Sequence, residues 1–289
     1  MCKRKFGDRK DAKLIRKVDS MHFVMPVIFP NRCDNEAFIS ERIDLTNLNE
    51  FLEKKNADNP EYKYNLFQAI VTAALKTIYL RPKMNIFIAN KRMYQRNDIT
   101  AAFVVKKLFT DDSEEGMATI KAKPGATIDT VHNEIYKKVS FCRTDSKGDS
   151  TQQLMDILNV IPRFISNSII SFICFLEKRG WAPAFVTAGD PYYSTVLLSN
   201  LGSIKLKCGY HHLSNWGTTS VFIVVGEKKI RPFFDENGNM EMRDSVDIGL
   251  TVDERIADGY YFSKTVRLLK TLLENPELLE KPMEEEVEY

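Results

Sequence analysis

The chain has 289 residues, of which 44% are apolar and 28% are charged, and its 41 basic residues nearly balance its 39 acidic residues. This composition is typical of a globular protein with a sizeable core, and a formal charge of +2 excludes the basic excess of nucleic-acid-binding proteins. Five scattered cysteines without a CxxC pair argue against a disulfide framework or a cysteine metal site. No secretory signal or flexible linker is evident, so we expect one cytoplasmic domain over residues 1–289.

The first half of the chain is predicted to contain helices before and after a group of strands. Thr46 is placed to cap a helix with an apolar face, and a longer helix over residues 64–82 should end at Pro82. Extended runs separated by short polar links then predict hairpin strands, at 84–90, 91–97 and 98–108. Helical spacing returns over residues 126–142, after a turn at Pro124 and Gly125.

The most apolar segment follows, with 13 uncharged residues from Phe164 to Leu176 between Arg163 and Glu177. A membrane-spanning helix needs about 20 predominantly apolar residues, so this segment is too short to cross a bilayer. We interpret it as a helix that is buried in the core or in a subunit interface, in preference to a helix lying on a membrane.

Strands and a final helix are predicted for the C-terminal third. Runs rich in strand formers at 194–202 and 219–234 precede a turn at 235–239. Apolar residues then alternate with polar ones from Val246 to Asp253, which predicts a strand with one buried face. After this strand, apolar residues recur at helical spacing up to Pro276, so the stretch VDERIADGYY, residues 252–261, forms a corner between a strand and a helix.

Common catalytic signatures are absent, which weakens nucleotide-binding and hydrolase interpretations. The chain has no GxxxxGK[ST] loop, GxGxxG turn, GxSxG elbow or HExxH helix. The adjacent pair His211 and His212 cannot by itself make a metal site, because neighbouring side chains of a strand point to opposite faces. We therefore expect no metal and a hydrogen-bonding or structural role for this pair.

Three segments together resemble the catalytic domain of the dihydrolipoamide acyltransferases of 2-oxoacid dehydrogenase complexes. In order and spacing they are LSNLG at 198–202, TTSVFIVVGEKK at 218–229 and TVDERIADGYYFSKTVRLLKTLLENPELL at 251–279. Further stretches, such as YHHLSNWGTTSVFI and DERIADG, are similar to stand-alone bacterial proteins of that superfamily. The resemblance implies the chloramphenicol acetyltransferase fold, an α/β two-layer sandwich with a mixed sheet covered by helices. The sequence shows neither a lipoyl domain nor a subunit-binding domain.

The resemblance also implies site residues. The family motif at the corner is HRxxDG, whose histidine takes a proton from the thiol of coenzyme A or dihydrolipoamide, and Glu254 occupies that position here. Ser199 falls on the hydroxyl that stabilises the tetrahedral oxyanion. Asp258 falls on the acid that braces the corner through an arginine, and Gly259 is expected to permit a tight turn into the helix. The resemblance further implies a homotrimer in which Ser199 faces a neighbour's Glu254.

Glu254 leaves two hypotheses open. A thiol titrates near 8.5 and a free glutamate near 4.3, so proton transfer to glutamate is uphill by about four pKa units unless burial raises the pKa of the carboxyl. Glu254 is then either a working base or half of an ion pair in a degenerate site; His211 or His212 is a further source of an imidazole. The chain is accordingly an acyltransferase using coenzyme A or acyl-coenzyme A as a substrate, or a silent trimeric assembly protein. We favour the enzyme, without nucleic-acid or membrane contact.

Overall fold

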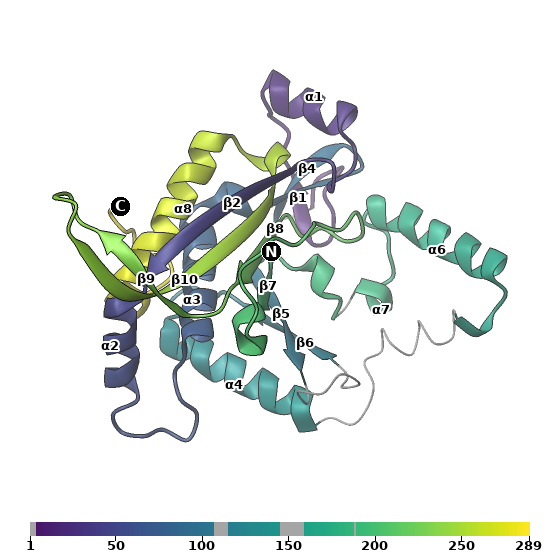
Figure 1. The fold of residues 1–289 in the computed structure, drawn as a ribbon. Helices are drawn as coiled ribbons and strands as arrows, with labels where there is room; N and C mark the ends of the chain where they lie inside the picture. Colours follow the sequence, from purple (N-terminus) through teal and green to yellow (C-terminus); the bar gives the residue numbers. More distant parts are fainter. Residues whose placement is uncertain (1–3, 107–114, 145–158, 188) are drawn as a thin grey trace.

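The fold is built on one large mixed sheet, shown in Figure 1 as part of a computed structural model that describes residues 4–106, 115–144, 159–187 and 189–289. The sheet has seven strands in the order β2-β10-β8-β7-β5-β6, with β9 paired to β10. Strand β7 runs parallel to β5 and β8, and the other pairs are antiparallel. The strands are β2 (Glu36–Asp44), β5 (Thr100–Lys106), β6 (Glu115–Lys121), β7 (Val196–Asn200), β8 (Val221–Val225), β9 (Lys229–Phe234) and β10 (Met240–Asp253).

A second, smaller sheet lies beside the first. Its three strands have the order β1-β4-β3 and are antiparallel, with bounds β1 (Ala12–Leu14), β3 (Ile86–Ala89) and β4 (Arg92–Arg96). The predicted extended runs at 84–90 and 91–97 are confirmed as the β3–β4 hairpin, whose turn at Asn90 and Lys91 has positive φ at both residues. These are the two left-handed positions that a tight hairpin turn requires.

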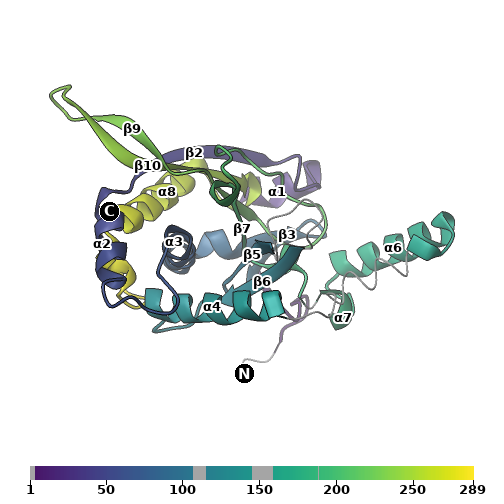
Figure 2. The same ribbon diagram turned by 60° about the horizontal axis from the view of Figure 1, so that its bottom comes forward.

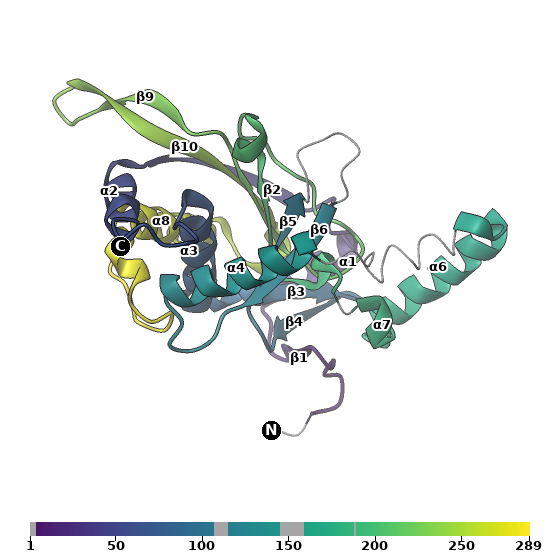
Figure 3. The ribbon, with the colours of Figure 1, turned by 90° about the horizontal axis from the view of Figure 1, so that it is seen from below.

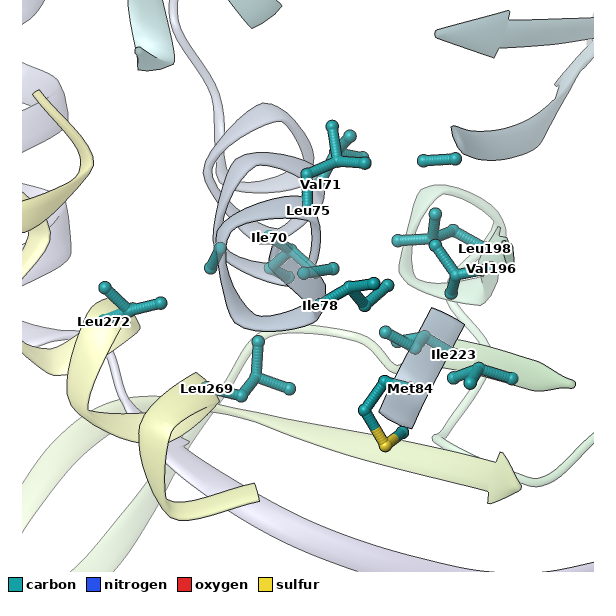
Figure 4. Close-up of a cluster of buried hydrophobic side chains, with 14 of the residues drawn as sticks. Ile70, Val71, Leu75, Ile78, Met84, Val196, Leu198, Ile223, Leu269 and Leu272 are labelled. Atoms are coloured by element: carbon teal, nitrogen blue, oxygen red, sulfur yellow. The ribbon is translucent and has the colours of Figure 1, made fainter. Parts of the chain in front are cut away.

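Helices cover one face of the large sheet, as Figure 2 shows, and the main hydrophobic core fills the space between the two layers. The helices of this layer are α2 (Thr46–Lys55), α3 (Leu66–Leu80), α4 (Ile128–Thr144) and α8 (Gly259–Glu274). Figure 4 shows Ile70, Leu75 and Ile78 of α3 among strand residues such as Leu198 and Ile223 and among residues of α8. The predicted mixed sheet covered by helices is therefore confirmed.

The local sequence explains where α3 starts and stops. Asn65 caps the helix by accepting from the Gln68 amide, and the Gln68 side chain accepts from the Asn65 amide in return, which makes a capping box. The helix ends at Leu80, and Pro82 opens a 3₁₀ turn over Pro82–Asn85. The helix predicted over residues 64–82 is thus confirmed, whereas Thr46 is not a cap: it is the first residue of α2 and bonds to the Asp44 carboxylate.

The other face of the sheet is partly covered by the loop that joins β7 to β8. The rings of Tyr210 and Phe38 meet edge to face, and His211 stacks on Phe222 with ring centroids 4.3 Å apart. A Cβ at Gly249 would lie 2.3 Å from the Gly209 carbonyl oxygen, so the loop backbone approaches β10 closely. The prediction that β10 buries only one face is wrong for its last residues, because Thr251 and Asp253 are also buried.

Helix α6 (Arg163–Lys178) projects away from the rest of the molecule in Figures 2 and 3. Its aromatic residues are exposed: Phe164 by 72%, Phe172 by 61% and Phe175 by 47%. The interpretation of this segment as a core helix is therefore wrong for its aromatic residues, which no part of the described chain buries. Two shorter helices, α1 (Ser20–Ile28) and α7 (Ala184–Thr187), complete the set named in Figure 1. Among the described helices, none combines the length and apolar character that crossing a membrane requires.

Candidate active site

The corner after β10 is held by backbone hydrogen bonds from both sides. Asp253 N donates to Ser220 O at 3.0 Å, and Glu254 N donates to Asn35 O at 2.9 Å. A single 3₁₀ turn over Glu254–Ile256 then leads to α8, which begins at Gly259. The strand-to-helix corner predicted for residues 252–261 is confirmed, and its geometry fixes where consecutive side chains point.

Arg255 turns inward and braces this corner. Its Nε and Nη2 donate to the two carboxylate oxygens of Asp253 at 2.7 and 2.6 Å, a bidentate pair in which both side chains are almost fully buried. Nη1 donates to the Phe29 carbonyl at 2.8 Å. A second arginine, Arg32, places its Nε 3.7 Å from the same carboxylate. The corner is therefore tied to the segment between α1 and β2 through one buried acid and two arginines.

Glu254 turns outward. Its side chain is exposed, and among the described residues its carboxylate has no hydrogen-bond or ion-pair partner. The neighbouring Arg255 cannot neutralise it, because that guanidinium is committed to Asp253. Glu254 is consequently free to face a ligand or a second subunit, and within one chain it is not removed from water.

Asp258 has a different role from the one expected. Its carboxylate accepts from Tyr261 N at 2.7 Å and caps the N-terminus of α8. In the described part of the chain no arginine pairs with Asp258, so the acid that braces the corner through an arginine is Asp253. Sequence reasoning placed Asp253 on the solvent side of β10; the signal it missed is that Asp253 and Arg255 stand two residues apart across a 3₁₀ turn, which brings their side chains together.

Gly259 does not provide a left-handed turn. It is the first residue of α8, lacks a positive φ, and a Cβ built on it would meet nothing within 4 Å. The expectation that the turn requires glycine here is wrong for the isolated chain.

Ser199 lies on β7 at the other end of the sheet. It pairs with Val224 of β8, which lies opposite Gly249 of β10, five residues before Glu254. Strand geometry therefore separates Ser199 from Glu254 by about 17 Å along the sheet and about 10 Å across it. Ser199 alternates with Leu198, which enters the main core, so the serine is on the face away from the helices. One chain brings Glu254 and Asp258 to the same corner but keeps Ser199 apart from them.

His211 and His132 occupy sites apart from the corner. His211 Nδ1 is 2.8 Å from the carbonyl of His212, and the ring stacks on Phe222, on the face of the sheet that also holds Ser199. His132 is buried, stacks on Tyr64 and lies 3.1 Å from Gln68 Oε1. In the ranges that the structure describes, no three His, Cys, Asp or Glu side chains gather as a metal site would require.

Comparison with known proteins finds a family model that matches the segment containing the corner. Residues 187–280 match the family model "2-oxoacid dehydrogenases acyltransferase (catalytic domain)", and this range includes Ser199, Glu254 and Asp258. The predicted resemblance to this acyltransferase family is confirmed. None of the curated proteins matches the chain.

Solved structures extend the likeness from this family segment to nearly the whole fold. A probable dihydrolipoamide acetyltransferase from Listeria monocytogenes has 15% identity and a TM-score of 0.58, covering 95% of this chain and 98% of its own. The dihydrolipoamide acetyltransferase of Azotobacter vinelandii has 15% identity and a TM-score of 0.60, with coverage of 92% and 94%. A chloramphenicol acetyltransferase has 15% identity and a TM-score of 0.56, with coverage of 91% and 98%. At such identities, these structures show a shared fold and no more.

Proposed function

We propose that this chain is an acyltransferase that moves an acyl group between a coenzyme A-type thiol and a small acceptor. The observation that carries the proposal is the corner itself, which lies within the family segment and directs the residue at the base position outward while a buried Asp253–Arg255 pair holds the backbone. A degenerate corner would not need to keep residue 254 unpaired.

In the proposed reaction, an acceptor thiol loses its proton to Glu254 and its sulfur attacks the thioester carbonyl. The resulting tetrahedral oxyanion accepts a hydrogen bond from Ser199, and the leaving thiolate of coenzyme A takes the proton back as the carbon–sulfur bond breaks. An exposed glutamate is a poor base for a thiol, because the two groups differ by about four pKa units. The proposal therefore requires that Glu254 be desolvated in the assembled protein.

A homotrimer supplies that burial. Ser199 and Glu254 stand too far apart to act within one chain, so we propose that Ser199 of one subunit meets Glu254 of the next, in a single acyltransferase-like domain over residues 1–289. In a cyclic trimer, each subunit contacts the next through two different surface patches, which is a heterologous interface. Sedimentation velocity at micromolar concentration tests this directly: a trimer is expected, and a strict monomer would contradict it.

The alternative is a trimeric assembly protein without catalysis. The glutamate in place of the family's histidine and the capping role of Asp258 favour this reading, since both depart from the family pattern. His211 is another possible source of a base, because it lies on the same sheet face as Ser199. A His211→Ala variant separates this route, as it should leave turnover unchanged if Glu254 is the base.

Thiol release from short acyl-coenzyme A donors, with dihydrolipoamide as acceptor, tests the enzyme proposal. If Glu254 is the base, Glu254→Gln abolishes turnover and Glu254→His keeps it but moves the pH profile toward neutrality. Ser199→Ala should lower turnover by about 10²- to 10³-fold without unfolding the protein. A folded trimer that neither binds coenzyme A nor gains turnover in Glu254→His would support the assembly protein instead.

A further inference from the structure

The hairpin formed by β9 and the start of β10 extends beyond the large sheet, as Figures 2 and 3 show. The start of β10 pairs with β9 alone, because β2 joins it only from Ser245 and β8 only from Ile248. The base of the hairpin is fixed to the rest of the chain by Arg231, whose Nη2 lies 2.8 Å from the carboxylate of Asp247. The β9–β10 hairpin is therefore an anchored projection.

One face of this hairpin is apolar and exposed. The strand register places Phe234 opposite Met240 and Pro232 opposite Met242, and Ile230 follows on the same face of β9. All five side chains are exposed, and the exposed fraction reaches 68% for Phe234. We call this surface the hairpin face.

The hairpin face continues the core side of the sheet. Alternation along β10 puts Met242 on the same side as Val246 and Ile248, which lie in the main core. Helix α2 reaches this side of the strand at Asp244, whose carboxylate accepts from Asn49. The exposure of Met242 shows that no described helix covers the strand beyond that point. The hairpin face is thus a sheet surface that lacks its layer of helix.

Helix α1 has the complementary property, because it exposes an apolar side that no described strand covers. It packs beside the corner, at the other end of β10, and Arg255 Nη1 donates to the carbonyl of Phe29 just after the helix. Pro26 is buried against the chain. The exposed side of the helix holds Met21, Phe23, Val24, Val27 and Ile28.

Charge favours contact between these two different surfaces over contact between two like surfaces. Residues 235–242, at the end of the hairpin, contain three exposed acids and no base, whereas residues 13–17, before α1, contain three exposed bases and no acid. Two hairpins, or two copies of α1, would bring like charges together, which opposes association. The 14 residues of β10 separate the hairpin from α1, so the two surfaces cannot meet within one chain.

We propose that the hairpin face of one subunit packs on the exposed side of α1 in a second copy of this chain. The inference rests on the proposed function, in which Ser199 of one subunit meets Glu254 of the next. Ser199 is displaced from the corner toward the hairpin, and α1 lies beside Glu254, so the same subunit boundary brings the hairpin to α1. The contact supplies the missing helix layer and covers the corner that carries Glu254.

Photo-crosslinking of the purified protein tests this contact. A benzoylphenylalanine in place of Phe234 should crosslink two chains, and mass spectrometry of the linked peptides should place the partner site within residues 20–29. The same probe in place of Phe233, on the opposite face of β9, is the matched control and should give no crosslink to α1. Absence of a crosslink between chains from position 234, or a crosslink only to the hairpin of the second copy, would overturn the proposal.

A change on α1 gives an independent check. Phe23→Glu in the protein that carries the probe at position 234 should lower the crosslink yield about 10-fold or more, because the contact would bury an unpaired charge. Phe23→Leu keeps an apolar side chain at the same exposed position and should retain the yield. Equal yields from the two variants would place the hairpin face elsewhere and so overturn the proposal.

Thiol release from an acyl-coenzyme A donor separates this inference from the proposed function. Turnover by an unmodified protein whose position 234 gives no crosslink to α1 overturns the contact and leaves acyl transfer standing. A crosslink to α1 without turnover supports the contact and counts against acyl transfer alone.

Discussion

Asp253 and Arg255 stabilise the corner because each satisfies the other in a setting that excludes water. Their side chains are 0% and 1% exposed, and the arginine also reaches the Phe29 carbonyl. The intervening residue, Glu254, points the opposite way and contributes nothing to this bracing. Of these three consecutive residues, Asp253 and Arg255 brace the corner, and Glu254 is exposed.

Removing the guanidinium should destabilise the fold strongly. Arg255→Ala leaves Asp253 buried beside only one more distant cation, and breaking such a pair typically costs 3–5 kcal/mol. Urea unfolding followed by circular dichroism measures the loss. Arg243→Ala is the matched control, because that arginine is 39% exposed in its pairs with Asp44 and Glu241 and should cost at most about 1 kcal/mol. Equal losses for the two variants would contradict the assigned bracing role.

Glu177 should make stability depend on pH. Burial raises the pKa of this carboxyl in the folded chain above its ordinary value of 4.5, so the folded state holds a proton that the unfolded state has released. Stability from this group is fully present below pH 4.5 and is lost as pH rises through the folded-state pKa. Glu177→Gln should therefore gain about 1–3 kcal/mol relative to the unmodified protein between pH 4.5 and pH 8. Glu53 is exposed, so Glu53→Gln should show no such gain in stability under the same conditions. Urea unfolding at each pH measures both variants.

At the scale of elements, local signals and distant contacts had different predictive value. Helix α3 and the β3–β4 hairpin could be predicted, because a capping box, a terminating proline and extended runs of strand formers are local sequence signals. Burial of Asp253 was missed because one of the two arginines around its carboxylate, Arg32, comes from a segment far earlier in the chain. The same limit applies to Ser199 and Glu254, whose separation depends on strand order and not on spacing.

Helix α6 is the element most at odds with its surroundings. Its apolar residues predicted burial, yet Phe164, Phe172 and Phe175 face water in one chain. Exposed apolar surface of this kind usually marks an interaction site. The other alternative predicted from the sequence, burial in a subunit interface, stays a prediction.

If α6 packs against another subunit, a charge on its apolar side should weaken association. Phe172→Glu should lower the sedimentation coefficient at micromolar concentration while leaving the far-ultraviolet circular dichroism unchanged, since a buried unpaired charge disfavours the contact. Asn167→Glu adds the same charge at an exposed polar position of the same helix and serves as the control. Identical sedimentation of both variants and the unmodified chain would remove α6 from the interface.

For the molecule as a whole, the sheet order has the largest consequence. It places the Ser199 position and the corner at opposite ends of β7 and β10, so a single chain holds two halves of the proposed site without joining them. The family resemblance predicts which residues form the site, and the topology separates Ser199 from Glu254 within one chain. Under the proposed function, the acyltransferase site is therefore shared between subunits.

Co-expressing Ser199→Ala with Glu254→Gln and measuring thiol release from an acyl-coenzyme A donor tests whether the site is shared. Each variant alone should be nearly inactive. In random mixed trimers, about a quarter of the boundaries unite an intact serine with an intact glutamate, so we expect recovery to about 25% of the unmodified turnover. Turnover of the mixture no greater than that of the separate variants would contradict a shared site.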